Sequence, residues 1–337
     1  MIRRLRVLIL LSRPAVLVLL GLFAAAGLAQ GGAGNDPVLL ARALFVVGGF
    51  ILCSVMVNDL ADEAIDRVNL PGVADRPLVT GAGTRSEFPL IAAVAAAVAL
   101  GASATIGWRA VLVVAAGLVL GLAYSLPPVR LSDRGAVATM LLPAGYVAVP
   151  FLVGLLSVRP TPTRSDLVLL VGLYLGFIGR IVLKDFRDVV GDALFGKRTF
   201  LVRHGRRWTC GCSAAGWVAG SIALLGVRGV TVPLVAAQVV WVAAALVLLR
   251  ALSQERGARR DEWLISAIAV VGRGMVLTLV THLGTVDAGW SPVGAAAAVT
   301  AVAAVILGQG VMMARHGPTG GVRVPEGWSV VTVPTGG

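Results

Sequence analysis

Ten apolar stretches, most of them close to twenty residues long, dominate this chain. About 20 apolar residues are needed for a helix to cross a bilayer, and a membrane-spanning segment must satisfy its backbone hydrogen bonds internally. The pattern therefore predicts an all-α, polytopic bundle of about nine to ten transmembrane helices. The expected spans are residues 14–30, 38–57, 88–107, 110–126, 135–157, 166–183, 210–227, 231–249, 264–283 and 291–313.

Composition and charge agree with a membrane protein. The chain is 57% hydrophobic and 14% charged, against about half and a quarter in soluble domains. If the N-terminus is cytoplasmic, threading the ten spans places most of the 29 Lys and Arg residues in cytoplasmic segments. The net charge of +12 then reports topology and does not indicate nucleic acid. We expect a multi-pass protein of the plasma membrane with no obligate protein partner, formed by one domain at 1–313 and a tail at 314–337.

Seven of the 17 acidic residues fall in two short windows that share the spacing Asp-x-x-Asp-x-x-x-Asp. Offsets of three and seven place these carboxylates on one face of a helix. Each window directly follows an apolar span, at the end expected to face the cytoplasm. The two windows contain Asp59, Asp62, Glu63 and Asp66, and Asp185, Asp188 and Asp192.

Crowded carboxylates need compensation, which a hard divalent cation supplies. Mg²⁺ takes one or two carboxylates, keeps some waters and completes its shell with substrate phosphates. Basic residues within or after the windows could hold the remaining phosphate oxygens. The sequence therefore predicts a Mg²⁺–diphosphate site between two facing acidic stripes, although a single such window could equally be a solvated helix end.

These motifs resemble a known family when they are taken together. Asn58-Asp59-Leu60-Ala61-Asp62-Glu63-Ala64-Ile65-Asp66, followed by Arg76-Pro77-Leu78, resembles the first signature of the UbiA superfamily of intramembrane prenyltransferases. Lys184-Asp185-Phe186-Arg187-Asp188-Val189-Val190-Gly191-Asp192 resembles the second signature. Tyr124-Ser125-Leu126-Pro127-Pro128 is similar to the Tyr-Ser-x-Pro-Pro that ends the fourth helix of this family. The resemblance covers about residues 10–250.

The resemblance implies a helix bundle around one central cavity, with a polar cap for Mg²⁺ and diphosphate. It implies metal ligands among Asn58, Asp59, Asp62, Asp66, Asp185, Asp188 and Asp192. It implies diphosphate contacts at Arg76, Lys184, Lys197 and Arg198, and catalytic roles for Asp62, Asp66, Asp188, Asp192 and Tyr124.

The expected activity is Mg²⁺-dependent transfer of an isoprenyl group from an allylic isoprenyl diphosphate to a small hydrophobic acceptor, aromatic or a quinone precursor. A terpene cyclase of the same superfamily would use the same ionisation site. An ion or phosphate transporter, a different class, would place ionisable groups at mid-membrane depth, whereas these acids cluster at one face. The segment from Asp66 to Arg76 is closer to the homogentisate, chlorophyll and geranylgeranylglyceryl-phosphate branches than to the 4-hydroxybenzoate branch, and it leaves the acceptor and the donor length open.

Two arginines fall inside predicted spans. Arg180 precedes Lys184 by one helical turn and is expected either to face the same cavity or to pair with a helix-end acid. Arg273 is a functional candidate because it is intramembrane, but snorkelling or a pair with a neighbouring helix is the favoured interpretation. The run at 264–283 that contains it is the weakest span, and either this run or 291–313 is expected to be peripheral.

Overall fold

The computed structural model describes residues 13–69, 76–194, 199–254 and 257–316, and every regular element in these ranges is helical. The first part of the chain forms α2 (Pro14–Gly31), α3 (Pro37–Asn69), α4 (Pro77–Thr80), α5 (Glu87–Ala104), α6 (Trp108–Ser125) and the 3₁₀ turn η1 (Leu131–Asp133). The middle forms α7 (Ala136–Pro143), the π turn η2 (Ala144–Ala148), α8 (Val149–Leu156), α9 (Arg164–Ile181), the 3₁₀ turn η3 (Val182–Lys184) and α10 (Asp185–Leu194). The last part forms α11 (Phe200–Gly220), η4 (Ser221–Leu225), α12 (Val232–Leu252), α13 (Ala258–Asp287) and α14 (Pro292–His316).

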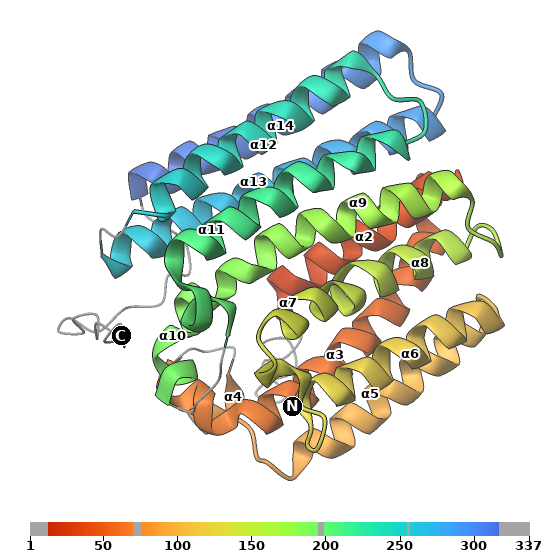
Figure 1. Cartoon of the computed structure of the whole chain (residues 1–337). Coiled ribbons are helices and arrows are strands. Elements are labelled where there is room, and N and C mark those ends of the chain that lie inside the picture. The colour runs from red at the N-terminus through yellow and green to blue at the C-terminus, as the bar shows by residue number, and fades with distance from the viewer. Residues whose placement is uncertain (1–12, 70–75, 195–198, 255–256, 317–337) are drawn as a thin grey trace.

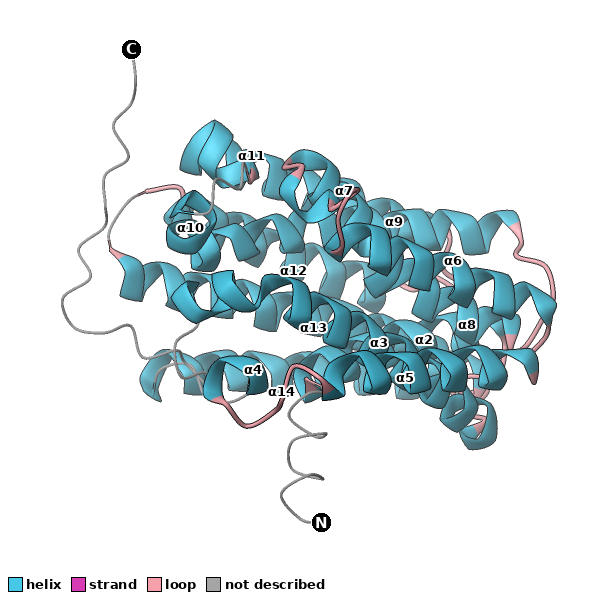
Figure 2. Ribbon diagram, turned by 90° about the horizontal axis from the view of Figure 1, so that it is seen from below, coloured by secondary structure: helices cyan, strands magenta, loops and turns pink. Residues whose placement is uncertain are grey.

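The described helices confirm the predicted multi-pass architecture. Nine of them are long and apolar enough to cross a membrane, and the apolar part of α2, Val16–Gly31, is a shorter tenth. The predicted run at 135–157 is one such segment, in which a π turn separates α7 from α8. The long helices run side by side in one bundle, and α4 and α10 lie toward the same end of it (Figures 1 and 2).

Glycines allow the central helices to approach closely. A Cβ on Gly27 of α2 would lie 2.0 Å from the carbonyl oxygen of Phe151 in α8, and one on Gly154 would lie 2.0 Å from that of Ala24. Small residues at such contacts give van der Waals packing, which replaces the hydrophobic driving force that is absent between helices in lipid. The α2–α8 pair is therefore fixed at a distance that any larger residue at these two positions would increase.

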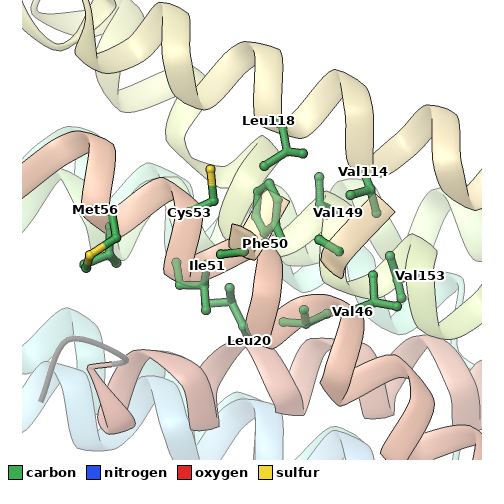
Figure 3. Packing of buried hydrophobic residues seen from close by; sticks show 14 of the residues in the cluster. Leu20, Val46, Phe50, Ile51, Cys53, Met56, Val114, Leu118, Val149 and Val153 are labelled. Atoms are coloured by element: carbon green, nitrogen blue, oxygen red, sulfur yellow. The ribbon is translucent and has the colours of Figure 1, made fainter. Parts of the chain in front are cut away.

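Phe50 of α3 links the hydrophobic core to the interior of the bundle. It is buried in a cluster with Val114 and Leu118 of α6 and Val149 of α8 (Figure 3). The same ring also lines the cavity described below. The wall of the cavity at this level is therefore part of the packed core.

The structure distinguishes the two C-terminal spans. The apolar window of α13 is 56% buried, the highest value among the described spans, whereas that of α14 is 11% buried, the lowest. The span predicted to be weakest is thus an inner helix, and α14 is the peripheral one, packed on α12 and α13. Arg273 made α13 look weak because hydropathy counts a charge as a cost without knowing that it faces a cavity.

Candidate active site

A cavity of about 490 Å³ lies inside the bundle and extends from its apolar interior to the end where α4 and α10 lie. Helices α3, α6, α9, α10 and α13 all contribute to its wall. Phe50, Leu120 and Phe177 belong to its apolar part. Its polar lining includes Arg13, Asn58, Asp62, Asp66, Arg76, Tyr124, Arg180, Lys184, Asp185, Arg187 and Arg273.

The first acidic window lies on the last turns of α3, which continues without interruption to Asn69. Residues 58, 62 and 66 follow one another at intervals of four, so they share a face of the helix, and all three line the cavity. The side chain of Asn58 donates a hydrogen bond to Asp62 at 3.1 Å. This face presents amide and carboxylate oxygens in a row along the polar part of the wall.

Asp59 lies outside this row. Its side chain is buried, it does not line the cavity, and it accepts hydrogen bonds from both Arg13 and Arg76. Arg76 also pairs with Asp66 at 3.0 Å. In the structure Asp59 therefore binds two cavity arginines and does not share the cavity wall with Asp62 and Asp66, and the metal-ligand role that the family resemblance implies for it stays a prediction.

Two cationic residues of the site have no assigned role in the sequence analysis. Arg13 precedes α2 and lines the cavity, and Arg130 donates a hydrogen bond to Asp62 at 2.9 Å. Both have a positive φ, 44° for Arg13 and 34° for Arg130, a conformation that costs energy for a residue other than glycine. Such backbone strain tends to occur at functional sites. The only sequence signals near these two arginines were Pro14, next to Arg13, and Pro128, two residues before Arg130.

The second acidic window begins at a change of helix type. The helix α9 ends at Ile181, η3 follows, and α10 starts at Asp185, so the window is turned relative to α9. Lys184, Asp185 and Arg187 line the same cavity as the first window, and α10 contacts α3. Arg187 is held by two hydrogen bonds to Glu262 of α13, at 2.8 and 2.9 Å.

Four residues expected at this site cannot be placed by their side chains. Asp188 and Asp192 belong to α10, but their side chains lie outside the described part of the structure. Lys197 and Arg198 also lie outside the described residues. The structure thus brings together in one cavity Asn58, Asp62, Asp66, Arg76, Tyr124, Lys184 and Asp185.

Aromatic rings form part of the cavity wall below the polar residues. The hydroxyl of Tyr124 accepts a hydrogen bond from Lys184 at 3.2 Å, and the Lys184 ammonium lies 5.8 Å from the centre of the Tyr124 ring. Tyr146 stacks on Phe177 with a centroid distance of 5.6 Å. Tyr124 is therefore oriented by a group from the second motif, with its ring on the wall of the cavity.

The donor set is chemically suited to Mg²⁺. The cavity offers oxygen ligands from Asn58, Asp62, Asp66 and Asp185, the hard ligands that Mg²⁺ prefers. Among the described side chains no group of three or more His, Cys, Asp or Glu residues converges on one metal-sized point. Mg²⁺ usually takes only one or two carboxylates and completes its shell with water and substrate phosphate, so the oxygen ligands that line the cavity are of the kind and number it needs.

The sequence of this chain is similar to those of known proteins. A sequence profile of the UbiA prenyltransferase family matches residues 17–269. The digeranylgeranylglyceryl phosphate synthase of Methanoculleus marisnigri is 34% identical over 221 residues, covering 60% of this chain and 72% of that protein. The bacteriochlorophyll synthase 34 kDa chain of Chloroflexus aurantiacus is 31% identical over 163 residues, covering 48% of this chain. The chain spans about half the length of that second relative, 51%.

Solved structures share the fold at low sequence identity. One concerns a digeranylgeranylglyceryl phosphate synthase, with a TM-score of 0.65 and 16% identity, covering 85% of this chain and 100% of the other. Another is a UbiA homologue from Archaeoglobus fulgidus bound to DMAPP and Mg²⁺, with a TM-score of 0.56 and 18% identity, covering 92% and 99%. At this identity the likeness concerns the fold alone. With most of its length matched by the profile, the chain belongs to the UbiA prenyltransferase family.

Proposed function

We propose that this protein is a membrane prenyltransferase that transfers an isoprenyl group from an allylic isoprenyl diphosphate to a hydrophobic acceptor. The observation that carries the proposal is the shared cavity, in which Asn58, Asp62 and Asp66 of α3 meet Lys184 and Asp185 of the second motif. This polar end continues into an apolar and aromatic interior that suits an isoprenyl chain. A diphosphate with an apolar tail matches both parts.

Two groups of residues would hold Mg²⁺. Asn58, Asp62 and Asp66 supply one set of oxygen ligands, and Asp185 with Asp188 and Asp192 of the same window supplies the other. Bound there, Mg²⁺ would neutralise the negative charge that develops on the departing diphosphate. Asp59 is assigned to positioning Arg13 and Arg76 instead, because it is buried beneath both guanidinium groups.

The basic residues around the cavity would grip the diphosphate. Arg76 and Lys184 line the polar end, together with Arg13, and Lys197 and Arg198 follow the second window in sequence. Preorganised cations stabilise charge that appears on a leaving group because they need no reorganisation during the reaction. The C–O bond of the donor breaks, and its electron pair stays on the diphosphate.

The allylic cation left behind must meet the acceptor before it meets water. The apolar wall around Phe50 and Phe177 would keep water from the cation, and the Tyr124 ring, which lines the same cavity, would stabilise it through its face. An electron-rich carbon or a hydroxyl oxygen of the acceptor then forms the new bond, and a proton leaves. No protein nucleophile is required.

We further propose an aromatic or quinone-precursor acceptor, and a cytoplasmic position for the motif end of the bundle in the plasma membrane. The relatives named for bacteriochlorophyll and digeranylgeranylglyceryl phosphate leave more than one acceptor class open. The orientation is supported by the basic residues at the motif end, among them Arg67, Arg85, Arg134 and Arg207.

The test uses the full chain in membranes with labelled geranyl, farnesyl and geranylgeranyl diphosphates and an acceptor panel, with Mg²⁺ or with EDTA. We expect Mg²⁺-dependent prenylation of an acceptor, lost in Asp62→Ala and in Asp188→Ala but retained in Asp36→Ala, the same change at the opposite end. A hydrocarbon product from the donor alone would identify the protein as a cyclase instead. Undiminished turnover in both motif variants would overturn the proposed site.

A further inference from the structure

Two arginines line the cavity deeper than the motif residues. Arg180 lies on α9, one turn before Lys184, and Arg273 lies on α13. A Cβ on Gly272, the neighbour of Arg273, would lie 3.5 Å from Cδ of Arg180, so the two helices meet at this level. The cavity therefore has two guanidinium groups beside its aromatic wall.

These arginines differ from the other arginines in and around the cavity in their partners. Arg13 and Arg76 pair with Asp59, Arg130 pairs with Asp62 at 2.9 Å, and Arg187 pairs with Glu262 at 2.8 Å. Among the described side chains neither Arg180 nor Arg273 has a carboxylate within ion-pairing distance, although Arg180 lies 5.9 Å from the ring centre of Phe177. The expected pairing with a helix-end acid or a neighbouring helix is therefore absent from the described structure.

Snorkelling does not account for Arg273. Along α13 it lies roughly 16 Å beyond Glu262, about three helical turns into the span. Its side chain lines the cavity together with Ile265, Ile268 and Ala269 of the same helix. An ionisable residue inside a membrane span is costly, and it usually marks a substrate pathway when it faces a cavity.

We propose that Arg180 and Arg273 bind an oxyanion of the acceptor, either a carboxylate or a phosphate monoester. This inference rests on the proposed function and adds the class of acceptor. Two guanidinium groups on different helices suit an oxyanion because each can donate parallel hydrogen bonds to its oxygens. The bound oxyanion would hold the acceptor between Tyr124 and the aromatic wall, below the polar end where Lys184 and Asp185 lie.

The two arginines could instead bind the diphosphate of the donor. Comparing the binding of aromatic oxyanions with the binding of pyrophosphate distinguishes the two roles. The full chain in lipid nanodiscs is unfolded thermally with benzoate or phenyl phosphate, with neutral benzamide or phenol, and with Mg²⁺ plus pyrophosphate. We expect stabilisation by at least one aromatic oxyanion and not by its neutral counterpart. In Arg180→Gln and Arg273→Gln the apparent affinity for that oxyanion should fall about tenfold or more.

Arg42→Gln, at an exposed arginine of α3, serves as the matched control and should keep the oxyanion response. Lys substitutions at 180 and 273 keep the charge but lose the parallel donors, so they should keep only part of it. Stabilisation by Mg²⁺ plus pyrophosphate should persist in all variants. The proposal is overturned if no oxyanion stabilises the wild type, if the Gln variants respond like the wild type, or if only the pyrophosphate response is lost. If Mg²⁺ plus pyrophosphate does not stabilise the wild type, and the wild type also shows no prenyl transfer, the proposed function itself is contradicted.

Discussion

Both ends of the bundle contain Arg–Asp pairs, but the pairs at the two ends have different surroundings. At the end opposite the motifs, Asp166 is fully buried and accepts hydrogen bonds from Arg159 at 2.5 Å and Gln30 at 3.2 Å. It also completes a capping box with Thr163 at the start of α9. At the motif end, Asp62 and Asp66 keep arginine partners but line the cavity.

The two ends differ in whether the carboxylates can be reached from the cavity. At the opposite end Asp287, like Asp166, joins parts of the chain that are far apart in sequence, bonding Arg228 and the backbone of Gly34, and neither acid lines the cavity. Such closed pairs satisfy buried charges and hold helix ends together. At the motif end the carboxylates face a space large enough for substrate. An Arg–Asp pair therefore indicates chemistry only where its carboxylate also faces a cavity.

The largest expected effect comes from Asp62→Asn, which keeps the size of the side chain but removes its charge. Turnover should fall by at least about 10²- to 10³-fold, the range seen when one electrostatic stabiliser is removed from an active site. The thermal unfolding temperature should change little, because Asn can still accept the Arg130 hydrogen bond. Prenyl transfer per folded molecule is the measurement, and a drop in folded protein that matches the drop in rate would contradict the prediction.

At the opposite end Asp166→Ala should show the reverse pattern. Removing one member of a buried ion pair leaves the Arg159 charge without its carboxylate, although Gln30 keeps its hydrogen bond to the Gly226 carbonyl, and the free energy of unfolding should fall by about 3–5 kcal/mol. The rate per folded molecule should stay close to that of the wild type, because Asp166 does not line the cavity. Chemical unfolding in detergent, with activity measured on the folded fraction, checks both statements. A selective loss of activity would mean that the two ends are coupled.

Sequence reasoning identified the fold and the two windows because apolar length and charge spacing are local properties. The offsets of three and seven predict Asp59, Asp62 and Asp66 on one face of the helix. The structure has Asp62 and Asp66 on one cavity wall, with Asn58 rather than Asp59 beside them. The position of Asp59 could not be obtained in this way, since a one-residue offset turns it toward arginines that come from other segments. The partners of Arg13 and Arg130 depend on tertiary contacts in the same way.

The same limit explains the two C-terminal spans. Hydropathy ranked the run around Arg273 as the weakest, yet α13 is the most buried span of the described chain. A hydropathy window measures the cost of a charge in lipid, but it cannot show that the charge faces a cavity. The short η3 turn, which separates the second window from α9 and packs on α11, was likewise not predicted from the sequence.

A smaller effect is expected from Asp59→Asn, which separates positioning from metal binding at the motif end. The variant loses the charge that holds Arg13 and Arg76, so these guanidinium groups should bind the diphosphate less well. We expect KM for the donor to rise about tenfold, equivalent to one charged hydrogen bond. The Mg²⁺ concentration that gives half-maximal rate should not change. A shift in that concentration as large as in Asp62→Asn would place Asp59 among the metal ligands after all.

The smallest effect should come from Tyr124→Phe, which removes only the hydroxyl that accepts the Lys184 hydrogen bond. The donor is charged but Lys184 is exposed, so the bond should contribute no more than a neutral one, about 0.5–1.5 kcal/mol, and kcat should fall by about two- to tenfold. Tyr124→Leu also removes the ring, whose face can contribute about 2 kcal/mol to a desolvated cation, and kcat should fall by about a further thirtyfold. Equal rates for the Phe and Leu variants would show that the ring does not face the reacting carbon. Tyr124 would then have a structural role, like the Arg–Asp pairs at the opposite end, because it joins α6 to η3 through its hydrogen bond with Lys184.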